Sequence, residues 1–94
     1  MDDDFAQVSI LIMGQVQGVF FRASALEQAQ SLGLNGWVKN LGDGSVEIVA
    51  EGRKYALEQF ADWCRQGPAG ARVEDVIVRW SAYRDEFRTF MIVR

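Results

Sequence analysis

A short segment near the N-terminus carries the residues best suited to hold an anion. It runs from Gly14 to Arg22 and reads Gly-Gln-Val-Gln-Gly-Val-Phe-Phe-Arg, with a second glycine at Gly18. Successive backbone amides of such a loop can point into one concavity, and the free amides and positive dipole end of a following helix add to the attraction. The segment therefore suits a phosphate group, although the same residues are compatible with an ordinary glycine-rich turn.

Arg22 strengthens the phosphate interpretation, because it falls in the first turn of the helix expected after this loop. A cation there faces the positive end of the helix dipole, which is unfavourable by roughly half a kcal/mol unless an anion lies nearby. A bound phosphate would supply that anion. The segment lacks the glycine spacing and the lysine of a nucleotide-binding P-loop, and it does not match the dinucleotide-binding fingerprint.

Asn40 is the second candidate for chemistry. It closes an expected strand just before a turn, a place where asparagine is common for structural reasons alone. Its carboxamide has one acceptor and two donors and does not titrate, so it is able to hold a water molecule in line with a bound phosphoryl group. This role requires the strand that ends at Asn40 to converge with the glycine-rich loop.

The composition excludes several other kinds of chemistry. The 94 residues include no histidine, a single cysteine (Cys64) and a formal net charge of −3. The lack of histidine removes Ser-His-Asp and Cys-His catalysis and the commonest metal ligand. A lone cysteine fits a reducing compartment, no apolar stretch is long enough to span a membrane, and scattered basic residues argue against nucleic acid. We expect a cytoplasmic monomer without metal, cofactor, membrane or nucleic-acid partners.

The residue pattern predicts the elements that position these side chains. We expect strands at residues 5–13, 36–40, 45–51, 73–80 and 87–93, and helices from Arg22 to Gly33 and from Lys54 to Gly67-Pro68. The order, βαββαβ plus a C-terminal strand, predicts an α+β fold of the ferredoxin-like split βαβ type, with two helices on one face of a mainly antiparallel sheet. At this length, one domain over residues 1–94 is expected.

Several aromatic residues have spacings typical of a core. Trp37, Phe60 and Trp80 are expected to face the interior, and none is assigned to catalysis. Phe20, inside the loop, is expected to pack against the core rather than to line the mouth of the site.

Two blocks of the sequence resemble the acylphosphatase family. The first is Gly-x-Val-Gln-Gly-Val-x-Phe-Arg, formed by Gly14, Val16, Gln17, Gly18, Val19, Phe21 and Arg22. The second is formed by Gly36, Trp37, Val38, Asn40, Asp43, Gly44, Val46 and Glu47. The resemblance continues to a C-terminal Phe-x-Ile-x-Arg at Phe90, Ile92 and Arg94, and so covers essentially the whole chain. Ser24, Ala25 and Leu41 depart from many members of the family, which puts efficiency in doubt more than reaction class.

The resemblance implies a hydrolase that converts acyl phosphates to a carboxylate and inorganic phosphate by direct attack of water, without a cofactor. It places catalysis on Arg22 and Asn40. The residues it implies for phosphate binding are Gln15, Val16, Gln17, Gly18, Val19, Phe20, Phe21 and Arg22.

Two other functions remain open from the sequence. One is a non-catalytic module that binds phosphate or carbamoyl phosphate, because the same domain occurs within larger proteins that process carbamoyl phosphate; the end of the chain at Arg94 favours a free enzyme. The other is a nucleic-acid binder on the same fold class, which the acidic charge and the lack of interleaved basic and aromatic residues disfavour.

Overall fold

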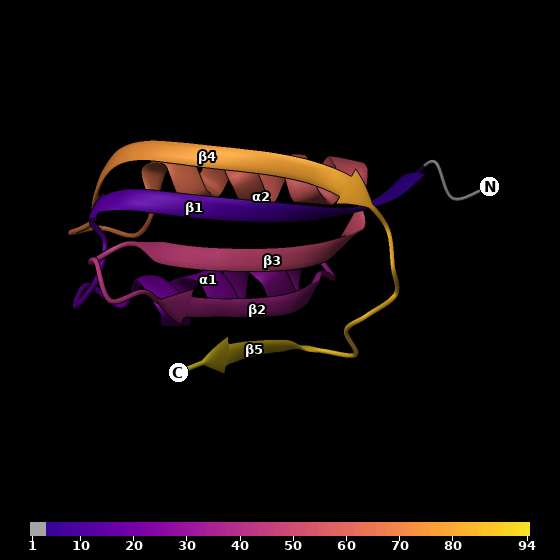
Figure 1. The fold of residues 1–94 in the computed structure, drawn as a ribbon, viewed down its shortest axis with the longest axis horizontal. Helices are drawn as coiled ribbons and strands as arrows, with labels where there is room; N and C mark the ends of the chain where they lie inside the picture. The colour runs from indigo at the N-terminus through magenta and orange to yellow at the C-terminus, as the bar shows by residue number, and fades with distance from the viewer. Residues whose placement is uncertain (1–3) are drawn as a thin grey trace.

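The computed structural model describes residues 4–94 as one mixed sheet with both helices packed on a single face (Figure 1). Its elements are β1 (Phe5–Gln15), α1 (Phe21–Ser31), β2 (Asn35–Asn40), β3 (Val46–Arg53), α2 (Lys54–Gln66), β4 (Arg72–Ala82) and β5 (Phe90–Val93). The strand order is β4-β1-β3-β2-β5, and every neighbouring pair is antiparallel except β2 and β5. The predicted ferredoxin-like sandwich is therefore confirmed.

The core lies between the sheet and the two helices, as the periodicities predict. Alternate residues of β1 from Ala6 to Ile12 are buried, and so is the stripe of α2 that contains Leu57, Phe60 and Cys64. Each large apolar side chain buried in this way contributes about 1.5–3 kcal/mol. Burial also raises the pKa of the Cys64 thiol, so this cysteine is a packing residue and not a nucleophile.

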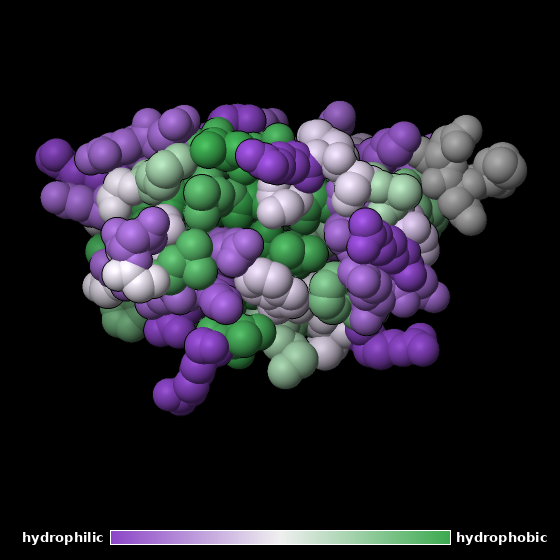
Figure 2. Space-filling view, in the orientation of Figure 1, coloured by the Kyte–Doolittle hydropathy of each residue, from purple (hydrophilic) through white to green (hydrophobic). Residues whose placement is uncertain are grey.

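Two tryptophans do not occupy the core positions expected for them. Trp37 pairs with Val49 and shares its face of the sheet, opposite the buried Val38, because two adjacent apolar residues cannot both face the helices. Trp80 pairs with Val8 on the helix side, yet it is 46% exposed because β4 is an edge strand. Figure 2 shows the face of the sheet that the helices leave uncovered, where apolar side chains lie among polar ones.

The β4–β5 connection differs from the expectation, since β5 begins at Phe90 and not at residue 87. Residues 83–89 form an irregular segment whose backbone amides at Arg84 and Glu86 are bound by the side chain of Glu51. These amides are therefore satisfied without strand pairing. No helix within residues 4–94 is long and apolar enough to cross a membrane.

Strand register brings distant parts of the chain together at one end of the sheet. Val46, the first residue of β3, pairs with Ile12 of β1 on one side and with Asn40 of β2 on the other. Val93 of β5 pairs with Lys39, directly before Asn40. The loop after β1, the β2–β3 turn and the C-terminus consequently lie at the same end, on the left in Figure 1.

Candidate active site

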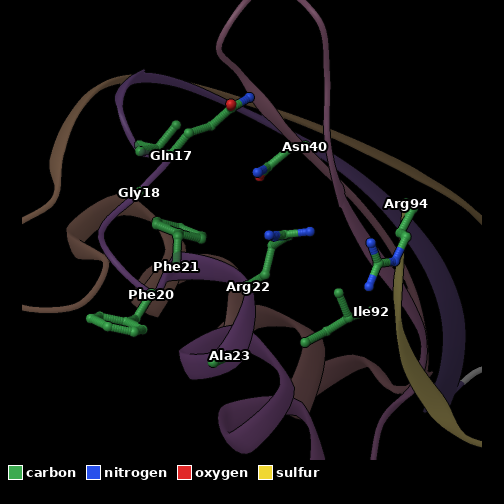
Figure 3. Close-up of a pocket in the computed structure, with 10 residues that line it drawn as sticks. Gln17, Gly18, Phe20, Phe21, Arg22, Ala23, Asn40, Ile92 and Arg94 are labelled. Atoms are coloured by element: carbon green, nitrogen blue, oxygen red, sulfur yellow. The ribbon is translucent and has the colours of Figure 1, made fainter.

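A cavity of about 590 Å³ lies at this end of the sheet. It is lined by Val16, Gln17, Gly18, Phe20, Phe21, Arg22, Ala23, Asn40, Ile92 and Arg94 (Figure 3). Among the described residues, Arg22 and Asn40 are thus brought to one space, as their proposed roles require. Two of the loop residues expected to bind phosphate do not line it, because Gln15 ends β1 opposite Arg72 and Val19 packs against the core.

The loop reaches the helix through two left-handed backbone positions. Gly18 has φ 76° and Phe20 has φ 61°. Glycine adopts this conformation without a steric penalty, whereas at Phe20 it costs about 1 kcal/mol. The ring of Phe20 is 83% exposed at the rim of the cavity, so the expectation that it packs in the core was wrong. Strained backbone of this kind concentrates at functional sites.

The turn that begins α1 leaves its backbone amides free. None of the amides of residues 18–23 donates a hydrogen bond to another described backbone group, and the first helical bond runs from the Ser24 N–H to the Phe20 carbonyl at 3.0 Å. No acidic side chain lies in this first turn, and Phe20 provides no side-chain cap. Residues with free donors, the positive end of the helix dipole and Arg22 therefore lie at the same cavity, which favours an anion.

Asn40 lines this cavity and carries one buried acceptor without a partner. Its Oδ1 atom is buried and receives no hydrogen bond within the described part of the chain. A buried polar atom without a partner costs about 1–3 kcal/mol, so it needs an explanation. Figure 3 shows the Asn40 carboxamide directed toward the guanidinium of Arg22. Asn40 therefore brings an uncharged amide group to the cavity lining, beside the cation of Arg22.

Gln17 fixes the loop to the β2–β3 turn. Its Nε2 donates to the carbonyl oxygens of Leu41 at 2.8 Å and Ser45 at 2.9 Å, the two residues that bracket the turn after Asn40. The sequence predicted only a phosphate-binding role for Gln17 and missed this positioning role of its side chain. A long amide side chain placed just before a loop glycine was the available signal.

Asp43 completes the turn. Its carboxylate accepts hydrogen bonds from the hydroxyl and the backbone N–H of the buried Ser45, and these bonds hold the pKa of Asp43 below its usual value. An ionised Asp43 therefore stabilises the turn that follows Asn40.

Ile92 and Arg94 were not predicted as site residues. Both line the cavity from β5 and its end, and the C-terminal Phe-x-Ile-x-Arg pattern was the signal that marked them. No group of three or more metal-ligating side chains occurs among residues 4–94. The cavity thus combines anion-binding groups with a neutral acceptor and lacks a titratable base among its lining residues.

Comparison with known proteins gives a consistent result. The acylphosphatase family model matches residues 8–92. An acylphosphatase of Aeropyrum pernix is 53% identical over 91 residues, which cover 96% of this chain and 90% of that protein. The structure of an acylphosphatase from Coxiella burnetii superimposes with a TM-score of 0.92 at 35% identity, covering 98% of this chain and 96% of the other.

One larger protein also contains a similar region. Full-length HypF in its phosphate- and nucleotide-bound form matches with a TM-score of 0.83 and 29% identity over 96% of this chain, but over only 12% of HypF. The same fold therefore occurs both as a small protein and as part of a much longer chain.

Proposed function

The chain belongs to the acylphosphatase family of hydrolases, and we propose that it hydrolyses the carboxyl–phosphate bond of acyl phosphates to give a carboxylate and inorganic phosphate. One observation carries the proposal: residues with unpaired anion-binding groups and the uncharged carboxamide of Asn40 line a single cavity. The phosphoryl group is then bound next to the position from which water attacks it.

The phosphoryl group is held by the loop and the start of α1. Free amides of residues 18–23 donate to its oxygens, and Arg22 forms a bidentate pair with two of them. Donors that are already oriented stabilise the charge that develops on these oxygens in the transition state. The sequence-based set for phosphate binding was Gln15, Val16, Gln17, Gly18, Val19, Phe20, Phe21 and Arg22, and the side chains of Gln15 and Val19 lie outside the cavity lining.

Asn40 positions the attacking water. Its carboxamide, which lines the cavity, forms a hydrogen bond with that water and holds it opposite the leaving carboxylate. The water oxygen bonds to phosphorus as the bond between phosphorus and the acyl oxygen breaks, the electron pair leaves on the carboxylate, and the proton of the water passes to phosphate oxygen or solvent. A carboxylate with a pKa near 4 leaves without a general acid, so the lack of histidine is no obstacle.

Further aspects of the proposal derive from the sequence. We expect a single domain over residues 1–94 that works as a cytoplasmic monomer, needs no metal ion or other cofactor, and binds neither nucleic acid nor membranes. Undiminished turnover in excess EDTA is the expected outcome for the metal-free mechanism, and loss of turnover on chelation would contradict it.

A non-catalytic module that binds phosphate or carbamoyl phosphate is the second candidate. The likeness to part of HypF is the observation that favours it. Such a module needs the loop and Arg22 but has no use for the carboxamide of Asn40 in the same cavity, which supports the enzyme.

Hydrolysis of benzoyl phosphate in isotopically labelled water tests the function and the site of attack together. We expect release of benzoate and phosphate with the label in phosphate, because water attacks phosphorus. Label in benzoate would contradict that step, and binding without turnover would favour the non-catalytic module. When this assay is applied to Arg22→Ala, the matched control is Arg65→Ala, since Arg65 lies on α2, outside the cavity lining.

A further inference from the structure

We propose that Arg94 binds a second anionic group on the acyl part of the substrate, so that the enzyme prefers acyl phosphates whose acyl group itself carries a negative charge. The inference rests on the proposed function and extends it to a substrate class. Arg94 is then a residue that determines specificity, distinct from the phosphate-binding arginine.

The sheet register fixes the position of Arg94. β5 runs parallel to β2 with Val93 paired to Lys39, so Arg94 follows directly beside Asn40. Figure 3 shows its guanidinium group turned toward the space that Arg22 also faces. Arg22 reaches this space from α1, whereas Arg94 reaches it from the far edge of the sheet. The two cations therefore approach a ligand from different elements.

The charged side chains that line the cavity are of one sign. Both arginines line it, no aspartate or glutamate is among its described lining residues, and the ion pair recorded for residues 4–94 joins Arg65 to Asp62 instead. Two unpaired guanidinium groups that share a cavity repel each other, and a ligand with two separated negative charges removes that repulsion. The chain as a whole has a net charge of −3, so this positive region is local.

The dimensions and surface of the cavity suit more than a phosphate ion. A volume of about 590 Å³ lies within the range of about 300–1,000 Å³ typical of sites for whole small molecules. The phosphoryl group occupies the end formed by Gly18 and Arg22. Ile92, two residues before Arg94 and on the same strand, offers an apolar wall for the carbon skeleton that joins the two charges.

A series of rigid substrates tests this inference. Benzoyl phosphate and 4-methylbenzoyl phosphate have uncharged acyl groups. In 3- and 4-carboxybenzoyl phosphate, a carboxylate adds a second negative charge at two different distances from the phosphoryl group. We expect wild type to have a higher kcat/KM for at least one carboxybenzoyl phosphate than for 4-methylbenzoyl phosphate. Arg94→Gln should lower this preference by about 10-fold or more, because it removes a hydrogen bond to a charged group. Arg65→Gln is the matched control and should leave the preference unchanged.

The remaining outcomes separate the inference from the proposed function. If Arg94→Gln lowers kcat/KM equally for charged and uncharged acyl groups, Arg94 contacts the phosphoryl group and the inference is wrong. The absence of any wild-type preference for either carboxybenzoyl isomer would also overturn it while leaving the hydrolase intact. If wild type hydrolyses none of the four compounds, the proposed function itself fails, and the inference fails with it.

Discussion

Each end of the sheet has a polar side chain that forms several hydrogen bonds to a connecting segment, but the two ends differ in which polar groups are left unpaired. At the cavity end, Gln17 donates to two carbonyl groups of the β2–β3 turn. At the opposite end, Glu51 is only 3% exposed and accepts from the backbone amides of Arg84 and Glu86 and from the side chain of Gln7, at 2.9–3.1 Å. Both carboxylate oxygens of Glu51 therefore accept hydrogen bonds.

The cavity end, by contrast, retains unpaired polar groups near Gln17. The Asn40 Oδ1 atom and the amides of residues 18–23 have no backbone or side-chain partner recorded within the described residues, and Phe20 has a strained backbone. The buried Asn40 Oδ1 atom lowers stability by about 1–3 kcal/mol. The comparison teaches that, within the described residues, unpaired polar groups lie around the cavity, whereas both carboxylate oxygens of Glu51 at the far end have partners.

Removal of Arg22 should have the largest effect on catalysis. Arg22→Ala is expected to lower kcat/KM for benzoyl phosphate by at least about 100-fold, as for the loss of one preoriented donor to a developing charge. Its free energy of unfolding should change little, because Arg22 makes no recorded ion pair within residues 4–94. Steady-state kinetics beside thermal unfolding checks both parts. Near-normal turnover by this variant would contradict the assignment of Arg22 as a catalytic residue.

Gln17→Leu should have the next largest effect, because it frees the loop from the turn. Loss of the two hydrogen bonds to Leu41 and Ser45 allows Asn40 to shift relative to the phosphate-binding amides, and a displacement of that kind should lower kcat by about 10-fold. Steady-state kinetics with benzoyl phosphate measures this change in kcat. An unchanged kcat would mean that the loop and the turn keep their relative position without this side chain.

Glu51→Gln should reverse that pattern. The substituted carboxamide cannot accept hydrogen bonds at both former oxygens, so the free energy of unfolding should fall by about 1–3 kcal/mol while kcat for benzoyl phosphate stays within about twofold. Chemical denaturation supplies the measurement, with the exposed Glu58→Gln as control. A kcat that falls with stability would show that the two ends are not independent.

The smallest effect concerns acid. Because hydrogen bonds from Ser45 lower the folded-state pKa of Asp43, its carboxylate stabilises the turn above about pH 4, and this stabilisation is lost as the pH falls through the lowered value. Asp43→Asn should therefore lose less stability than wild type on acidification below about pH 4.

Turnover should be nearly flat from about pH 5 to 8, since no histidine is present. A bell-shaped profile centred near neutrality would contradict this.

The sequence predicted the fold, and it singled out two residues that the structure brings to one cavity, because these signals are local. Alternation gives the strands, helical spacing gives the helices, and Arg22 and Asn40 stand at predictable element ends. Exposure on an edge strand, as at Trp80, depends on strand order and was predicted wrongly. The place of Arg94 in the cavity depends on the parallel pairing of β5 with β2, which no local pattern specifies.

The division of labour between Arg22 and Asn40 is tested most directly by one variant. For Asn40→Ala, kcat for benzoyl phosphate and the inhibition constant of inorganic phosphate are measured on the same preparation. Water positioning belongs to the transition state, so kcat should fall by about 100-fold while the phosphate inhibition constant stays within about threefold of wild type. Equal losses in kcat and in phosphate affinity would contradict this account and would mean that Asn40 merely holds the hairpin in place.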